Sequence, residues 1–108
     1  MITASLSDKF ASAVRDLATS AAPIKQRLHP AFLSVHPIFE ADMPSQELRQ
    51  TCRLLLEEFS RVQDPLRGNV LATLEQMSDE EAEKVADLIW SICVGLQAWE
   101  KESAGYRC

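Results

Sequence analysis

Between residues 78 and 99, apolar residues recur at alternating steps of three and four, the spacing that places side chains on one face of a helix. This apolar seam consists of Ala82, Val85, Ile89, Ile92, Leu96 and Trp99. Ser78 stands just before it, and Glu81 follows three residues later, which is the capping-box pattern of a helix start. The pattern predicts one amphipathic helix of about 22 residues, roughly 33 Å long.

The middle of this helix is apolar on more than one face. Leu88 flanks the seam on one side, while Trp90 and Val94 fall where a bundle helix is normally polar. A helix that is apolar all round is normally buried all round. Either the segment from Phe32 to Phe39 covers Trp90, or another chain does.

Three more helical patterns precede this one. Residues 5–21, capped by Ser5 or Ser7, present Leu6, Phe10, Ala13, Val14, Leu17 and Ala21. Residues 45–63 present Leu48, Cys52, Leu55, Phe59 and Val62, widened by Leu54 and Leu56, with a Glu57–Arg61 ion pair on the wet side. Residues 65–77 follow Asp64 as cap and present Leu66, Val70, Leu71, Leu74 and Met77.

Residues 22–44 differ because prolines stand at positions 23, 30, 37 and 44. Each proline removes an amide donor and disfavours helix at the residue before it. This predicts short helical turns that start at the prolines and are joined by kinks. Residues 102–108 show no periodicity, so we expect a disordered tail.

These elements predict an all-α fold. It is a small bundle of four main helices, with a proline-kinked segment of short helical turns between the first and the second. At 108 residues the chain is expected to form a single helical domain, residues 1–108.

Composition is that of an ordinary globular protein, with 46% hydrophobic and 25% charged residues. No apolar run approaches the roughly 18 residues that span a membrane, and no basic stretch with an apolar core opens the chain, so a cytoplasmic location without membrane contact is expected. The chain has three cysteines, an odd number. Cys52 and Cys93 have apolar neighbours in helical patterns and are interpreted as small buried side chains rather than parts of a disulfide framework, whereas Cys108 could form an adventitious disulfide between molecules.

The net charge of −5 comes wholly from residues 69–108, which hold three basic and eight acidic side chains. Glu80, Glu81 and Glu83 crowd the start of the last helix, where acids favour the helix dipole or form a patch for a basic partner. Although Arg49 and Arg53 share a face and Lys25 lies near Arg27, a pI near 4.9 argues against direct nucleic-acid binding.

Catalytic chemistry is scarce in this sequence. Three scattered glycines exclude a phosphate-binding loop. His29, His36 and Cys52 are the only candidates for a metal site or a nucleophile, and their spacing matches no standard pattern. We therefore expect no enzyme, no catalytic or metal-binding residue and no cofactor.

The remaining signal is apolar surface beyond the needs of one small bundle. It predicts a non-enzymatic regulator or adaptor that binds another protein through helical surfaces, as a homodimer. Inhibition of a regulator, for example a transcription regulator, is the favoured form. The predicted interface residues are Trp90, Val94, Leu88 and Leu54, and further candidate partner contacts are Phe32, Phe39, Glu80, Glu81 and Glu83. The alternatives are an acidic nucleic-acid mimic that inhibits a DNA- or RNA-binding protein, or a small chaperone or secretion partner.

Overall fold

In the computed structural model, which describes residues 6–63, 66 and 68–105, the regular structure is helical throughout. The elements are α1 (Leu6–Thr19), α2 (Ile24–Val35), the 3₁₀ turn η1 (Glu40–Asp42), α3 (Gln46–Phe59), α4 (Asn69–Gln76) and α5 (Asp79–Gly105). The all-α prediction is confirmed. The described residues form five α-helices rather than four main ones.

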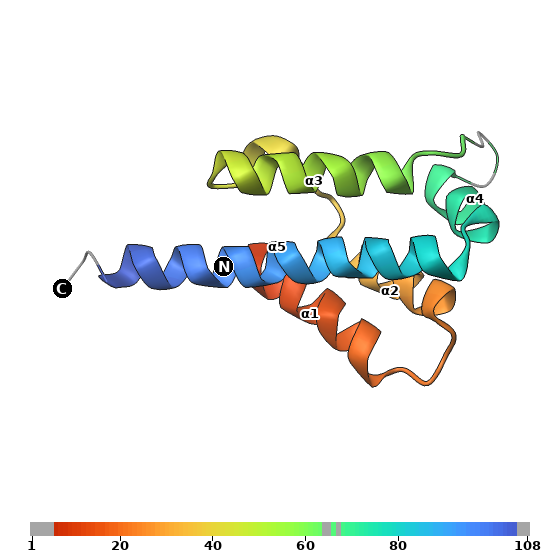
Figure 1. Cartoon of the computed structure of the whole chain (residues 1–108), viewed down its shortest axis with the longest axis horizontal. Helices are drawn as coiled ribbons and strands as arrows, with labels where there is room; N and C mark the ends of the chain where they lie inside the picture. Colours follow the sequence, from red (N-terminus) through yellow and green to blue (C-terminus); the bar gives the residue numbers. More distant parts are fainter. Residues whose placement is uncertain (1–5, 64–65, 67, 106–108) are drawn as a thin grey trace.

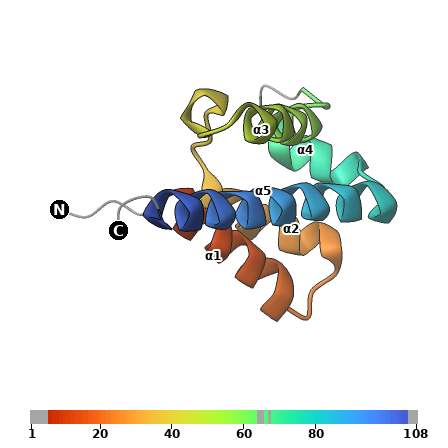
Figure 2. The ribbon, with the colours of Figure 1, turned by 60° about the vertical axis from the view of Figure 1, so that its left-hand side comes forward.

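The long helix α5 is the axis of the fold. It contacts α1, α2 and α3, so α3 lies along one side of it and the α1–α2 pair along the other (Figure 1; Figure 2). Residues from all five helices share one hydrophobic core, whose largest fully buried side chains include Phe10, Leu28, Phe59, Ile89 and Ile92. Within the described residues, every helix is too short or too polar to cross a bilayer.

The predicted start and inner face of α5 are confirmed. The amide of Glu81 donates to Ser78 Oγ at 3.1 Å, and the amide of Ser78 donates to Glu81 Oε1 at 3.2 Å, which completes the capping box. The predicted seam is buried from Ala82 to Leu96, whereas Trp99 at its end is exposed. The helix also continues to Gly105, because residues 97–104 are mostly good helix formers. The predicted tail therefore does not begin at residue 102, and residues 106–108 lie outside the described part.

The proline segment differs from its prediction. Residues 24–35 form one continuous helix with Pro30 inside it, instead of separate short turns. Pro23 precedes the first turn, where a missing amide costs nothing. Pro30 does remove a helix hydrogen bond, but Leu28, Ala31 and Val35 are fully buried on one face, and burial outweighs that loss. The short turn η1 after this helix begins at Glu40, three residues after Pro37, and so does not start at a proline as predicted.

Helix α3 begins where predicted, since Ser45 Oγ accepts a hydrogen bond from the amide of Leu48 at 3.2 Å. Helix α4 begins later than predicted, at Asn69. Gly68 precedes it with a φ of 90°, a conformation that favours glycine. Leu66 therefore lies before the helix and is exposed rather than on its apolar face. Ser5, Asp64 and Pro65, the other predicted caps and helix start, lie outside the described residues.

Basic side chains of α2 bind the ends of neighbouring helices. Arg27 Nη1 donates to the carbonyl of Leu17 in α1 at 2.6 Å, and Lys25 Nζ donates to the carbonyl of Glu75 in α4 at 3.2 Å. Cations favour helix C-termini, where the last carbonyls lack helical partners. Both residues therefore serve the fold.

Candidate protein-interaction surfaces

A groove runs between α3 and α5, which lie side by side in Figure 1. It holds two hollows, of about 430 Å³ and about 360 Å³. The first is lined by Leu54, Glu58, Arg61, Glu81, Lys84, Asp87 and Leu88. The second is lined by Ser45, Glu47, Leu48, Thr51, Ser91, Gly95, Ala98, Trp99 and Glu102. We call these residues together the α3–α5 groove.

Gly95 sets the depth of this groove. A Cβ atom at that position would stand 2.7 Å from Leu48 Cδ2, closer than real Cβ contacts allow. The absence of a side chain therefore lets Leu48 of α3 rest against the backbone of α5. Small residues flank this contact at Thr51, Ser91 and Ala98, which leaves the second hollow open.

The charge of the α3–α5 groove is mostly negative. Its acidic lining residues are Glu47, Glu58, Glu81, Asp87 and Glu102, and its basic ones are Arg61 and Lys84. Leu54 is 52% exposed and Trp99 is 43% exposed, so apolar surface is available between these charges. The groove thus combines apolar contacts with an acidic rim.

Arg61 links the two walls of the groove. Its guanidinium donates to Glu58 Oε2 at 3.1 Å and also to Glu81 of α5. The hydrogen bond from Arg61, supported by those from Ser78, lowers the pKa of Glu81 to about 2. The predicted Glu57–Arg61 pair is wrong, because Arg61 turns toward the neighbouring helix. Of the three acids predicted as partner contacts, Glu81 is thus bound within the chain, whereas Glu80 and Glu83 are exposed.

Trp90 and Val94 lie outside the groove. Trp90 is 55% exposed and Val94 is 42% exposed, so the segment from Phe32 to Phe39 does not bury Trp90. Leu88 and Trp90 are two positions apart and so point about 160° away from each other around the helix. The four predicted interface residues therefore belong to two surfaces: Leu54 and Leu88 in the groove, Trp90 and Val94 on the outer side of α5.

A second seam runs along that outer side, which the sequence reasoning missed. Its six members recur at steps of four, three, four, three and four, and all are exposed: Glu83, Asp87, Trp90, Val94, Gln97 and Lys101. We call them the outer seam of α5. Asp87 belongs to both surfaces, because it also lines the first hollow of the α3–α5 groove. The signal was present in the sequence, but four of the six residues are polar, and a search for apolar periodicity passes over them.

The two candidate aromatic contacts are separated by the fold. The ring of Phe32 packs edge-on against Phe59 with centroids 4.8 Å apart, and it is half-buried. Phe39, in contrast, is 59% exposed beside η1. Phe32 thus supports the core, and Phe39 presents apolar surface to solvent.

The surroundings of Cys52 and His36, two of the candidates for a metal site or a nucleophile, are those of residues that support the fold. Cys52 is fully buried, and burial, followed by the charges of Glu40 and Asp42, raises the pKa of its thiol to about 11. A thiol of that pKa stays protonated at neutral pH, the opposite of an activated nucleophile. His36 is exposed, and its ring lies near that of Phe32. Among the described residues, no group of three His, Cys, Asp or Glu side chains is placed to hold a metal ion.

The arginines on the outer side of α3 are also engaged. Arg53 forms an ion pair with Glu40 at 2.6 Å, and Arg49 Nε donates to the carbonyl of Met43 at 3.2 Å. These contacts fasten η1 and the residues after it to α3, so both arginines take part in the fold.

Comparisons with models of protein families, with curated proteins and with solved structures found no match to this chain.

Proposed function

We propose that this chain is a non-enzymatic adaptor or regulator. It works as a homodimer and binds a helical segment of another protein in the α3–α5 groove. The observation that carries the proposal is the groove itself, which places exposed apolar side chains between acidic ones. The favoured form is an inhibitor of a regulator, with the helix of that regulator as the bound segment.

The shape of the groove favours a helix as the ligand. Two helices side by side leave a channel that accepts the apolar ridge of a third helix, with anchors at steps of three, four and seven. Leu54 and Leu88 would meet such anchors in one hollow, and Trp99 in the other. Burying a leucine side chain contributes about 1.5–3 kcal/mol, so a few anchors supply useful affinity.

The acidic rim supports a partner with basic side chains. Five acidic and two basic side chains line the groove, so lysine or arginine beside the apolar anchors is favoured. Regulators that bind DNA carry basic surfaces for phosphate contacts. A groove of this charge therefore suits stoichiometric inhibition of a transcription regulator.

The experiment uses a fluorescent amphipathic peptide of about five helical turns, built from leucine and lysine. Its anisotropy is measured with wild type, with Leu54→Glu and with the matched control Leu33→Glu, which makes the same change at an exposed leucine on α2. We expect Leu54→Glu to weaken binding about tenfold or more, because a buried apolar contact is lost. Leu33→Glu should bind as wild type does.

A peptide of leucine and glutamate with the same apolar pattern tests the charge preference, and we expect it to bind much more weakly. If the lysine peptide binds Leu54→Glu as well as wild type but does not bind Glu80→Lys/Glu83→Lys, the groove is not its binding site. That result would support an acidic mimic that acts through the start of α5.

A further inference from the structure

We propose that two copies of this chain pair through the outer seam of α5. The two helices are antiparallel, and the two-fold axis passes the outer side of α5 between Trp90 and Val94, at the level of Ile92 along the helix. The inference rests on the homodimer in the proposed function and adds the face, the orientation and the register. The occupant of this face is thus a second copy of the same chain.

The outer seam is symmetric about the middle of the helix. Helix α5 spans residues 79–105, so Ile92 is its central residue. Glu83 and Lys101 each lie nine positions from Ile92, Asp87 and Gln97 five positions, and Trp90 and Val94 two positions. In an antiparallel pair centred there, the two helices overlap along their whole length. Each residue then lies opposite the partner's residue that is equally far from Ile92 in the other direction.

The pairs that this symmetry creates are chemically complementary. Glu83 faces Lys101 of the partner subunit, an acid opposite a base. Asp87 faces the partner's Gln97, whose amide can donate to the carboxylate. Trp90 faces the partner's Val94, which buries a large aromatic side chain against an aliphatic one.

A parallel pair of the same seams would be unfavourable. It would place Glu83 opposite Glu83 of the partner subunit and Lys101 opposite the partner's Lys101. Like charges at such positions repel, and Asp87 would add a further acidic pair. The order of charges along the outer seam therefore selects the antiparallel orientation.

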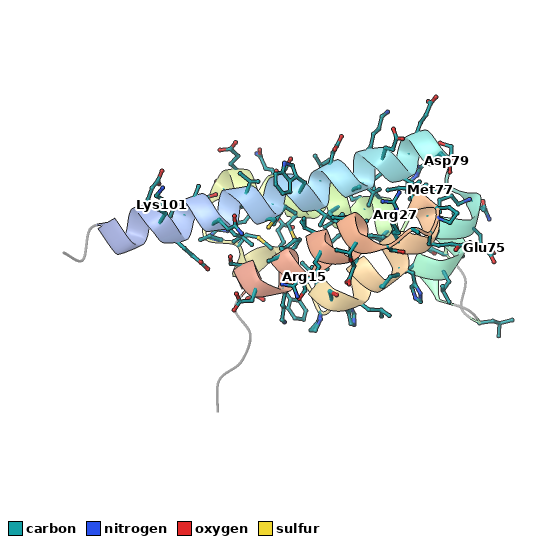
Figure 3. All side chains as sticks on the ribbon, turned by 90° about the horizontal axis from the view of Figure 1, so that it is seen from below. Arg15, Arg27, Glu75, Met77, Asp79 and Lys101 are labelled. Carbon is teal, nitrogen blue, oxygen red and sulfur yellow. The ribbon has the colours of Figure 1, made fainter. Side chains whose placement is uncertain are left out.

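The end of α5 is also left uncovered by the other residues that the structure describes. In Figures 1 and 3 its C-terminal turns extend beyond α3 and α1, and residues 97–102 are all exposed. Lys101 points away from the rest of the molecule in Figure 3. Glu83 and Lys101 lie about 27 Å apart along the helix axis, so the partner's Glu83 would bind this projecting end.

Trp90 is the anchor of the proposed contact. Tryptophan is enriched among the residues that dominate binding energy, and Trp90 is two positions from the proposed axis. A seam of six side chains per copy is small beside a standard interface, so we expect association in the micromolar range.

The experiment is a charge swap, measured as the dimer dissociation constant by sedimentation equilibrium at low salt on the full chain. Glu83→Lys and Lys101→Glu each place like charges opposite each other twice per dimer, and each should raise the constant about tenfold. The double variant Glu83→Lys/Lys101→Glu rebuilds both pairs in reverse. It should return the constant to within about threefold of wild type.

Two controls carry the same charge changes away from the outer seam. Lys84→Glu changes an exposed lysine on the groove side of α5, and Glu57→Lys changes an exposed acid on α3. Neither should alter the dissociation constant more than about twofold at matched ionic strength. Circular dichroism confirms that each variant stays helical.

The outcomes separate this inference from the function on which it rests. The pairing is supported if wild type dimerises, both single variants dimerise more weakly, and the double variant regains the dissociation constant of wild type. If wild type dimerises but the single variants have the same dissociation constant as wild type, or the double variant does not regain it, the pairing is overturned and the homodimer stands. A wild type that stays monomeric at every concentration overturns the pairing and the homodimer together, while the binding of the lysine–leucine peptide to the groove is decided independently.

Discussion

Helix α5 carries two seams with the same alternating steps, and among the residues that the structure describes, the other helices cover only one of them. The inner seam, from Ala82 to Leu96, is buried against α1, α2 and α3. The outer seam, from Glu83 to Lys101, is exposed along its whole length. Spacing shows which residues share a face, but only the placement of the other helices decides which face becomes core.

The chemistry of the two seams differs in a way that fits this division. The inner seam is wholly aliphatic, apart from the exposed Trp99 at its end, and gains its energy from removal of apolar surface from water. The outer seam has apolar residues only at its centre and charges of opposite sign at its ends. An apolar centre with a polar rim is typical of a contact between separately folded proteins.

The largest expected loss of stability comes from a substitution in the inner seam. Ile92→Ala removes methyl groups from a fully buried side chain and should lower the free energy of unfolding by about 2–5 kcal/mol. Val94→Ala, two positions away on the outer seam, should change it by less than about 0.5 kcal/mol. Urea unfolding at low protein concentration measures both. Equal losses would mean that the two seams are not distinguished by burial within one chain.

A smaller change in stability is expected at the groove, where Glu81 links α5 to Arg61, which follows the end of α3. The pKa of Glu81 is about 2 in the fold against 4.5 for an ordinary glutamate, so its contribution to stability is present above pH 4.5. That contribution is lost as the pH falls through about 2. Between pH 5 and pH 2, the free energy of unfolding should therefore fall more for wild type than for Glu81→Gln. A Glu57→Gln control should follow wild type, and identical pH profiles for all three would contradict the bridge.

Much of the fold followed from local rules. The capping box at Ser78 depends on residues three positions apart, and the spacing of apolar residues in α3 and α5 shows which of them share a face, so both could be predicted from the sequence. The continuous helix through Pro30 could not be predicted that way, because the burial of Leu28, Ala31 and Val35 by distant elements decides it. Local preference loses where tertiary packing is strong.

The candidate surfaces were predictable only in part. Trp90, Val94 and Leu54 were predicted as contact residues from the sequence, and the structure shows that all three are exposed. Their division into a groove and an outer seam required the position of α3, which places Leu54 and Leu88 in one hollow. The link from Arg61 to Glu81 joins residues twenty positions apart, and no spacing rule within one helix contains it.

The most direct test of the account is sedimentation velocity on wild type and Trp90→Glu across a wide concentration range, with Leu54→Glu as a matched change in the groove. We expect wild type and Leu54→Glu to associate into dimers as concentration rises, and Trp90→Glu to remain a helical monomer. A wild type that stays monomeric throughout, or a Trp90→Glu variant that still dimerises, would contradict the claim that the outer seam of α5 joins two copies of this chain.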